Sequence, residues 1–598
     1  MATKKVPINY TNRDFASIKS ELVNYAKRYY PETYQDFKEV SFGSLMLDTV
    51  AYVGDILSFY LDYQANESFL DSAAEYKNVL RLSKQLGYTF SGNPSSTGIV
   101  DFYIVVPSNN VGLGPNTAYL PILKKGSSFF STSGVTFLLT ENVDFSNPNN
   151  EVTVGRVNPS TGVPISYAVK AGGQVVSGKI VSETFSIDEY EKFRRLNLGA
   201  PLVAEILSVF DADGNEYYQV DYLSQDVIYK EVTSRTQDKD LVPMVMRPYS
   251  VPRRFCLKTN GATSYMQFGF GSDAENAVSS PVDPANIVLQ MHARDYISDT
   301  SFDPSRLLKS GKLGVTPSNT TLSVQYRVNL QGNVNAAAGT VTRVGSTTFS
   351  FNSPSTLNAS TIAGVQNSLE LFNINPILGD ISNPTAEEIR IRTRDFFTTQ
   401  NRAVTKKDYE AIIYAMPSRF GAVKRCNIVQ DPDSFKRNLN LYILAENTDG
   451  NLAEAPMSLK ENLKMWLGNY KMINDTIDIL DGRIINVGIN FEVFTDPDIN
   501  KYDVLNACQI SLANHFSDPL LLGEPLYITD IYTLLNAIRG VVDTKKVEII
   551  LKKGTRYAST NLKNLNELKS ADGRYVSVPI NAVFEIKYPS IDIKGAIR

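Results

Sequence analysis

Residues 44–66 place large apolar side chains on almost every side of a predicted helix, and this segment limits the fold more than any other. At 1.5 Å per residue the helix would be about 34 Å long. Its acidic residues are Asp48, Asp55 and Asp62, which recur every seven residues and form one narrow polar stripe. A helix that is apolar nearly all round has to be buried nearly all round. The candidate contact residues are Leu45, Val50, Tyr52, Val53, Ile56, Leu57, Phe59, Tyr60 and Tyr63.

Two shorter predicted helices flank this segment and offer one way to bury it. One covers 15–29, and the other begins at a capping pattern of Ser72 and Glu75. Together the three helices could close a small bundle. We favour the alternative, in which 44–66 completes its core against helices of other chains and its aspartate stripe faces water or basic partners. A well-folded monomer formed by residues 1–90 alone would contradict this hypothesis.

The period of the apolar residues changes along the chain and predicts four regions. Residues 1–90 read as a helical core-bundle segment, and the turn-rich sequence SGNPSSTG at 91–98 reads as a linker. Residues 99–370 alternate with period two, which predicts a β-rich middle of two subdomains. Helices return in 384–598 between strands, which predicts two subdomains with helices covering one face of each sheet. The predicted fold class is therefore multidomain α+β, with an N-terminal helical bundle segment, a β-rich middle and C-terminal two-layer α+β domains.

The sequence lacks the motifs of familiar enzymes and metal sites. The chain has only two histidines, and its three cysteines form no CxxC pair. Neither HExxH nor GxSxG occurs. The segment QFGFGS has no lysine and no third glycine, so we interpret it as a tight β-turn rather than a nucleotide loop. We therefore expect no catalysis, no cofactor and no metal, although two distant carboxylates could still meet to form a hydrolase site.

Charge and hydropathy narrow the range of partners. The net charge is −4, so the chain has no global basic field for nucleic acid. No uninterrupted run of 18 apolar residues occurs, and no apolar segment follows the two lysines at the N-terminus. We therefore expect no nucleic-acid binding, no membrane insertion and no signal peptide.

Long stretches at both ends of the chain resemble a known family. The runs RDFASIKSELVNYAKRYYPETYQDF, GSLMLDTVAYVGDILSFYLDYQANESFLDSA and LSKQLGY are similar to the start of the large baseplate wedge subunit of T-even-type contractile-tailed bacteriophages. The run TRDFFTTQNRAVTKKDYEAIIYAMPSRFGAVKRC resembles the signature of the wider baseplate J-like proteins. The resemblance covers most of the chain and is weakest in the middle.

The resemblance implies a structural role in the virion, in a tail baseplate assembled in the cytoplasm of the bacterial host. Such subunits occur twice in each wedge and form a ring of twelve around the central hub. Their N-terminal helices join a core bundle with an elongated helical wedge subunit. A lysozyme-like sheath-initiator wedge protein and other small wedge proteins dock nearby. The ring rearranges when the sheath contracts. By position, 45–66 would be the bundle helix.

Two other classes of function remain open from the sequence. A β-rich middle with exposed tyrosines would suit a receptor- or glycan-binding tail protein, and glycan binding by residues 98–370 would support that class. A tail-associated hydrolase would lose its activity when one carboxylate pair is changed. The N-terminal helix needs partners to bury its apolar residues, and the sequence has no fibre-like repeats. These two features favour a structural wedge subunit over a binding protein or a hydrolase.

Overall fold

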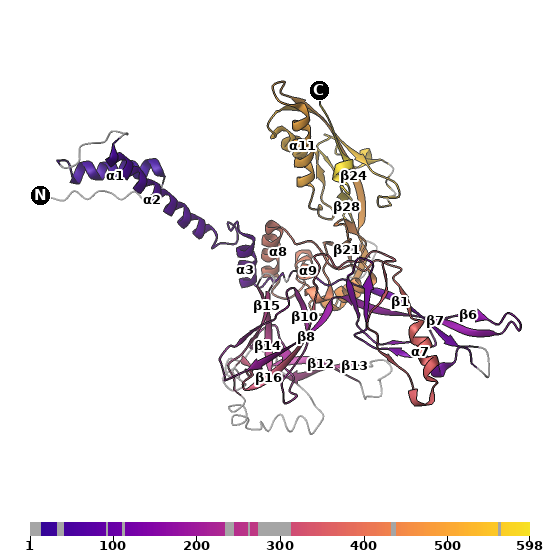
Figure 1. The fold of residues 1–598 in the computed structure, drawn as a ribbon. Helices are drawn as coiled ribbons and strands as arrows, with labels where there is room; N and C mark the ends of the chain where they lie inside the picture. Colours follow the sequence, from indigo (N-terminus) through magenta and orange to yellow (C-terminus); the bar gives the residue numbers. More distant parts are fainter. Residues whose placement is uncertain are drawn as a thin grey trace. The chain divides into compact units, whose positions relative to one another are not determined.

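The computed structural model divides the chain into two compact units (Figure 1). The described residues are 14–32, 41–90, 92, 94–109, 114–233, 244–260, 263–272, 313–431, 438–559, 562 and 564–597. Unit 1 comprises Met1–Phe90 and Pro384–Gln400, and unit 2 comprises Ser91–Asn383 and Asn401–Arg598. Helices make up unit 1 and sheets dominate unit 2, so the predicted multidomain α+β class is confirmed.

The helices of unit 1 pack in pairs. α1 (Phe15–Tyr29) packs on α2 (Phe42–Asn66), and α3 (Tyr76–Gln85) packs on α8 (Ala386–Thr399). The sequence placed α8 with the C-terminal region and gave no sign that it would join residues 1–90. Unit 1 therefore draws on two segments that are about 300 residues apart in the sequence.

Side-chain caps set where these helices begin. The Asp14 carboxylate accepts the backbone N–H of Ser17 at the start of α1, and the Ser41 hydroxyl accepts that of Ser44 at the start of α2. The Thr385 hydroxyl caps α8 in the same way. Such caps satisfy N–H groups that have no partner within the helix. Because Ser41 is the cap, α2 begins two residues earlier than the sequence pattern predicted.

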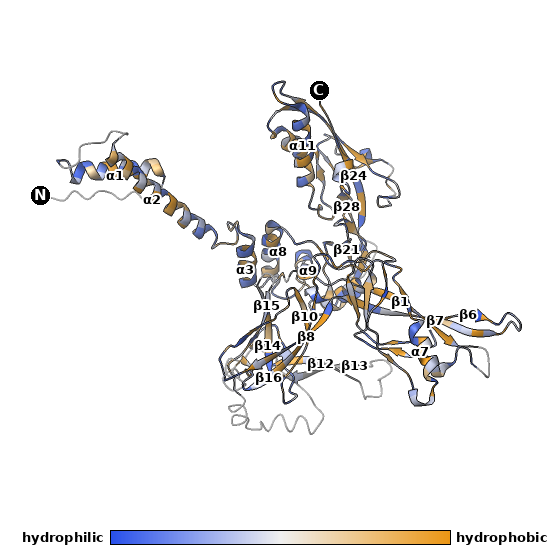
Figure 2. Ribbon diagram, viewed as in Figure 1, coloured by the Kyte–Doolittle hydropathy of each residue, from blue (hydrophilic) through white to orange (hydrophobic). Residues whose placement is uncertain are grey.

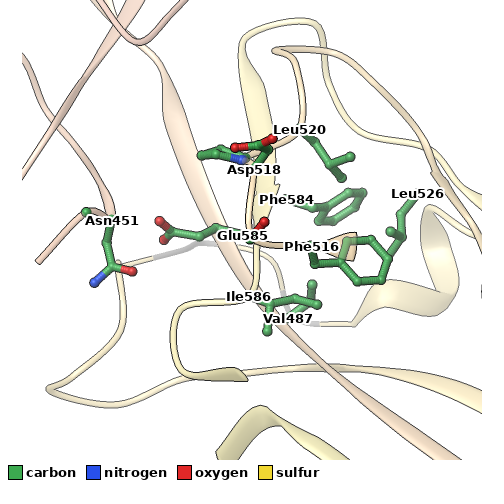
Figure 3. A pocket seen from close by; sticks show the side chains of 12 residues that line it. Asn451, Val487, Phe516, Asp518, Leu520, Leu526, Phe584, Glu585 and Ile586 are labelled. Carbon is green, nitrogen blue, oxygen red and sulfur yellow. The ribbon is translucent and has the colours of Figure 1, made fainter. Parts of the chain in front are cut away.

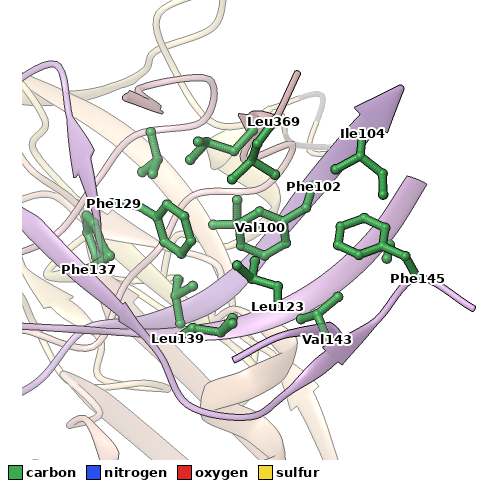
Figure 4. Packing of buried hydrophobic residues seen from close by; sticks show 14 of the residues in the cluster. Val100, Phe102, Ile104, Leu123, Phe129, Phe137, Leu139, Val143, Phe145 and Leu369 are labelled. Carbon is green, nitrogen blue, oxygen red and sulfur yellow. The ribbon is translucent and has the colours of Figure 1, made fainter. Parts of the chain in front are cut away.

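An antiparallel sheet with the order β17-β3-β4-β7-β1-β19 organises the middle of the chain, and β6 also pairs with β7. Its strands are β1 (Thr97–Pro107), β3 (Ser128–Ser131), β4 (Thr136–Leu139), β6 (Glu151–Val157), β7 (Pro164–Ser177), β17 (Val341–Val344) and β19 (Glu370–Phe372). Alternate residues of β1 point into one core, where the Phe102 and Phe129 ring centroids lie 4.9 Å apart (Figure 4). Val100, Phe102 and Ile104 are fully buried there, as period-two alternation requires.

Smaller sheets complete the β-rich middle. One has the order β10-β16-β8, a second has the order β11-β14-β15-β9, and a third has the order β18-β2-β5. Their strands are β2 (Ile122–Leu123), β5 (Val143–Asp144), β8 (Lys179–Ile187), β9 (Arg195–Asn197), β10 (Val203–Phe210), β11 (Tyr218–Gln219), β14 (Arg254–Asn260), β15 (Thr263–Phe268), β16 (Thr320–Val328) and β18 (Phe349–Ser350). The strands β12 (Val227–Thr233) and β13 (Met244–Ser250) pair as a ribbon, and α7 (Ala359–Asn367) packs near β1.

The C-terminal region consists of helices packed on sheets. α9 (Lys406–Tyr414) and α10 (Met457–Gly468) lie against the sheet of β20 (Arg425–Gln430), β21 (Asn438–Glu446), β22 (Leu452–Ala453) and β23 (Thr476–Asp481). α11 (Lys501–His515), α12 (Ile528–Asn536) and α13 (Pro589–Asp592) lie against the sheet of β24 (Arg483–Thr495), β26 (Val541–Leu551), β28 (Ala582–Glu585) and β29 (Ile593–Ile597). β25 (Leu526–Tyr527) pairs with β27 (Tyr575–Val576). Each sheet has its own apolar core beneath its helices.

Buried polar side chains hold the sheets of unit 2 together. The fully buried Arg327 guanidinium donates to the Ser95 hydroxyl at 2.8 Å and pairs with the Glu205 carboxylate at 3.0 Å. Within the segment 91–98, which the turn-rich sequence predicted to be a linker, residues 94–98 are buried. Thr97 already belongs to β1. This short stretch therefore packs between elements of unit 2, where the Ser95 hydroxyl accepts a hydrogen bond from the buried Arg327.

A second buried network joins the β-rich middle to the C-terminal region. The Asn335 side-chain amide donates to the backbone carbonyls of Asp380 and Glu446, each at 2.9 Å. The Lys424 ammonium pairs with the Glu446 carboxylate at 3.0 Å, and both side chains are buried. Burial, opposed by the hydrogen bond from Val334, raises the pKa of Asp380 to about 7, and the nearby Glu446 adds to the rise.

Candidate assembly surface

The face of α2 that α1 covers consists mostly of small and acidic residues, and its one large apolar side chain, Leu47, is half-buried. Ser44 and Ala51 are the buried residues of α2, and Gly54 lies against the Ile18 side chain of α1. A Cβ placed on Gly54 would lie 3.3 Å from Ile18 Cδ1. The Lys19 ammonium reaches Asp48 at 2.6 Å. Small residues let two helices approach closely, so α1 occupies the side of α2 that has the least apolar area to bury.

The large apolar side chains of α2 point away from α1 and are exposed. We call this set the α2 apolar surface; Figure 2 shows apolar residues along this helix. Its members are Phe42, Leu45, Met46, Val50, Tyr52, Val53, Leu57, Phe59, Tyr60, Leu61 and Tyr63. Eight of the nine residues predicted from the sequence belong to it, whereas Ile56 lies within the same arc but is half-buried. The structure therefore brings the predicted residues together on one surface of one helix.

The α2 apolar surface is wide. At 100° per residue its members span an arc of roughly 200° around the helix axis. An aromatic side chain has about 150–250 Å² to bury, and Phe59 remains 65% exposed. With similar fractions along 25 residues of helix, the exposed apolar area exceeds the few hundred Å² of the largest patch on a typical soluble monomer. A patch of this size marks an interaction surface.

Some residues of this surface were absent from the predicted set. Phe42 precedes the predicted start of the helix, and Met46 and Leu61 fill gaps between predicted members. Their spacing fits the same arc, so an angular plot of the sequence would have found them. α1 adds two exposed aromatic side chains, Tyr25 and Tyr29, near its C-terminal end. Their ring centroids lie 4.7 Å apart.

Part of the aspartate stripe lies on the α1 side of α2, whereas we expected the whole stripe to face water or basic partners. Asp48 pairs with Lys19 of the same chain, and Asp48 and Asp55 are half-buried. Asp62 lies farther along the helix and is exposed. The stripe thus borders the intramolecular contact, and the opposite side of α2 is apolar.

The described helices of unit 1 do not enclose α2. α3, which the sequence placed in a possible three-helix bundle, packs on α8 instead. Only its N-terminal junction meets the end of α2, where the Tyr63 hydroxyl donates to the Glu75 carboxylate at 3.1 Å. Tyr63, 39% exposed, is therefore already engaged within the chain. The other members of the α2 apolar surface keep their exposed area.

By length and composition, α2 is also long enough and apolar enough to cross a membrane. Core helices of soluble proteins can have the same length and composition, so these two properties alone do not make α2 a membrane span. Asp55 sits near the middle of α2. An aspartate at the centre of a spanning helix costs about 2.5–3.5 kcal/mol on insertion, which favours a protein partner over lipid.

No cluster of three or more histidine, cysteine or acidic side chains that could hold a metal ion occurs among the described residues. The three cysteines are free and buried, and burial raises the pKa of Cys508 to about 11, so this thiol is a poor nucleophile. Gly269 of QFGFGS lacks the left-handed backbone expected of a tight turn. Instead, a Cβ there would meet the Leu313 carbonyl oxygen at 2.2 Å, so this glycine permits close contact between two backbones.

A pocket of about 40 Å³ lies in the C-terminal region (Figure 3). Its lining includes Phe516, Phe584 and Glu585. The Glu585 carboxylate accepts the Leu452 N–H at 2.7 Å and the Asn486 amide at 2.8 Å, while burial raises its pKa. Pockets for small ligands usually measure about 300–1,000 Å³. This one is too small for a sugar ring, and its carboxylate is already bonded to the surrounding backbone and side chains.

Comparison with known proteins finds a family that is similar to part of unit 1. Residues 14–85 match the family model of the N-terminal domain of a bacteriophage baseplate protein. This range begins at the cap of α1 and ends with α3, so it contains the whole α2 apolar surface. The match supports a structural role in a baseplate. No curated protein matches the chain.

Solved baseplate structures show only a distant likeness. The cryo-EM structure of the anti-feeding prophage baseplate is 9% identical at a TM-score of 0.24, covering 95% of this chain and 90% of that one. The baseplate subcomplex TssK-TssF-TssG of the type VI secretion system is 8% identical at a TM-score of 0.22, covering 73% of this chain and 96% of that one. At such low scores neither likeness carries an argument about function.

Proposed function

We propose that this chain is a structural subunit of the baseplate of a contractile phage tail, held to neighbouring subunits by the α2 apolar surface. The observation that carries the proposal is the position of that surface. It lies on α2, its large side chains are exposed, and residues 14–85 around it match a baseplate N-terminal domain. Permanent assemblies bury about 2,000 Å² or more in interfaces that resemble a protein core, and α2 supplies an unfinished core of this kind.

The resemblance in the sequence extends the proposal to a T-even-type wedge subunit. The chain would then occur twice in each wedge and form a ring of twelve around the hub. Its partners would be a second copy of itself, an elongated helical wedge subunit, a lysozyme-like sheath initiator and other small wedge proteins. The subunit would assemble in the host cytoplasm, belong to the virion and rearrange on contraction, without catalysing a reaction.

The test is incorporation of a double variant, Leu57→Ser with Phe59→Ser, into tails produced in infected cells. Both residues are exposed in α2, so the substitutions remove contact area without disturbing the fold of the free chain. We expect tails without complete baseplates in negative-stain electron micrographs. The matched control is Ile473→Ser, which changes a side chain that is 99% exposed in unit 2 and should leave baseplates intact.

Normal baseplates built from the double variant would overturn the assembly role of α2. Vesicle flotation supplies a second arm with the unmodified full chain and vesicles of phosphatidylcholine and phosphatidylglycerol. We expect the chain to remain in the dense fraction. Flotation that is lost in the double variant would instead identify α2 as a membrane-binding helix and contradict the proposal.

A further inference from the structure

The segment between α2 and α3, residues 67–75, contains several side-chain and backbone hydrogen bonds, and we call it the elbow. It runs from Glu67, the C-cap of α2, to Glu75, the N-cap of α3. The Ser72 hydroxyl donates to the Asn66 carbonyl at 2.8 Å, and the Ala73 N–H donates to the Phe69 carbonyl at 2.9 Å. Nearly every turn of the elbow is thus tied to a neighbouring turn.

Glu67 ends one helix and caps the next. Its carboxylate accepts the backbone N–H groups of Ala74 at 2.7 Å and Glu75 at 3.1 Å, and the side-chain amide of Asn78 at 2.7 Å. Glu75 itself makes no side-chain cap, so Glu67 supplies the anion that the N-terminus of α3 favours. The hydrogen bond from Asn78 is the main cause that holds the pKa of Glu67 below its ordinary value. The Ser72-x-x-Glu75 capping box predicted from the sequence is therefore replaced by a more distant residue.

Arg390 of α8 holds the elbow from the other side. Its Nε donates to the Leu70 carbonyl at 2.9 Å, and its Nη2 donates to the Ala73 carbonyl. Its Nη1 pairs with Glu387 one turn earlier on α8 at 2.6 Å. The three donors of one planar group thus join two backbone carbonyls of the elbow to α8, a geometry that lysine cannot reproduce. Ala73 beneath this group is fully buried.

We propose that Arg390 is a positioning residue that fixes the direction of α2 relative to α3 and α8, so that the α2 apolar surface is presented on a rigid arm. What the arm is for rests on the proposed function, whereas the role of Arg390 in fixing the direction of α2 does not. Both ends of α8 continue directly into unit 2, at Asn383 and Asn401. Within unit 1, the elbow and Arg390 therefore join α2 to α8 by side-chain contacts.

A neighbouring arginine provides the matched control. Arg394, one turn later on α8, pairs with Asp71 of the same elbow, but these two side chains are 60% and 69% exposed. Arg390 is 16% exposed and binds backbone carbonyls. Exposed ion pairs contribute little to stability, so removing Arg394 deletes an equal charge next to the same segment and leaves the elbow closed.

The experiment measures a distance distribution in the full chain without any partner. Cysteines introduced at the exposed positions Thr49 of α2 and Arg81 of α3 carry spin labels, and the native cysteines are buried. Pulsed electron paramagnetic resonance should give one narrow distribution for the parent and for Arg394→Ala. Arg390→Ala should broaden it, and amide exchange over residues 67–79 should rise about tenfold or more as the elbow opens locally. In Arg394→Ala the exchange should stay within about twofold of the parent.

Arg390→Lys keeps the folded state testable if Arg390→Ala loses helical circular dichroism. Lysine retains the charge beside Glu387 but cannot bridge both carbonyls, so the distribution should again broaden. A distribution as narrow in both Arg390 variants as in Arg394→Ala would overturn the proposal. Because no partner is present, this result is independent of whether the α2 apolar surface builds a baseplate.

Discussion

The strand β1 and the helix α2 carry similar apolar residues and use them in opposite ways. In β1, Val100, Phe102 and Ile104 are fully buried against other strands of the same chain. In α2 the buried residues are Ser44 and Ala51, and the aromatic side chains are exposed. The middle sheet therefore completes its core within the chain, whereas α2 buries its smallest residues and leaves its largest apolar ones exposed.

The difference shows that apolar content alone does not define a core. A period-two pattern has one inner face, which a second layer of the same chain can cover. An apolar arc of roughly 200° on a helix needs several neighbours, and the described part of the chain supplies only α1 on the opposite side. The apolar residues of α2 thus contribute little to the stability of the free chain, and they are available for assembly.

The largest effect expected on stability is in the middle core. Phe102→Ala removes a fully buried ring that packs against Phe129, so the free energy of unfolding of this region should fall by about 3–5 kcal/mol. Chemical denaturation followed by amide exchange of β1 and β7 measures it. A loss below about 1 kcal/mol would mean that the core is loosely packed, and the contrast with α2 would fail.

The next effect concerns a charge that unit 2 buries. The ordinary pKa of an aspartate is 3.8, and that of Asp380 is about 7. Between these values the unfolded chain is ionised and the folded chain retains the proton, so stability falls as pH rises and levels off above about pH 7. Asp380→Asn keeps an oxygen for the Val334 N–H and removes the buried charge.

We therefore expect Asp380→Asn to be more stable than the parent by a few kcal/mol at pH 8, and by little at pH 4. Thermal denaturation at a series of pH values measures this difference. The control is Asp449→Asn, an exposed aspartate in the turn after β21. If Asp380→Asn were more stable than the parent by the same amount at every pH, ionisation of the Asp380 carboxyl group would not be the cause.

The sequence predicted a feature well when the residues that cause it lie close together along the chain. The apolar arc of α2 follows from one local period, and eight of nine predicted residues are exposed on it. The start of α9 shows the same local character, because its capping box pairs Thr405 with Asp408 within one turn. Local patterns of this kind need no knowledge of the fold.

Contacts between distant segments were not predictable. Nothing in the sequence indicates that Arg390 reaches the carbonyls of Leu70 and Ala73, more than 300 residues away. Backbone carbonyls have no residue-specific signature, so such a contact depends on the fold alone. The Ser72-x-x-Glu75 pattern failed for a related reason. It matches a local rule, but Glu67 already occupies the N–H groups that the predicted cap would need.

A moderate effect is expected at the contact of α1 with α2. Gly54→Leu would push a side chain into Ile18, whose Cδ1 lies only 3.3 Å from the position that a Cβ on residue 54 would take. We expect a loss of about 1–3 kcal/mol in the packing of α1, seen as faster amide exchange over residues 15–29. The control Thr49→Leu adds the same side chain on the exposed side of α2. Equal exchange in both variants would show that α1 does not pack at Gly54.

The smallest effect on stability is expected at Phe59. The same substitution is half of the double variant that should prevent baseplate assembly. The Phe59 ring is 65% exposed and contacts the rings of Tyr60 and Tyr63 of the same helix, with centroids 6.0 and 6.3 Å apart. Serine and phenylalanine have similar helix propensities, so Phe59→Ser should change the free energy of unfolding of the free chain by no more than about 0.5 kcal/mol. Amide exchange of α2 measures this. A loss of about 2 kcal/mol or more would mean that Phe59 is enclosed in the free chain. The α2 apolar surface would then be a core like that of β1, and the free chain would not need a partner to cover it.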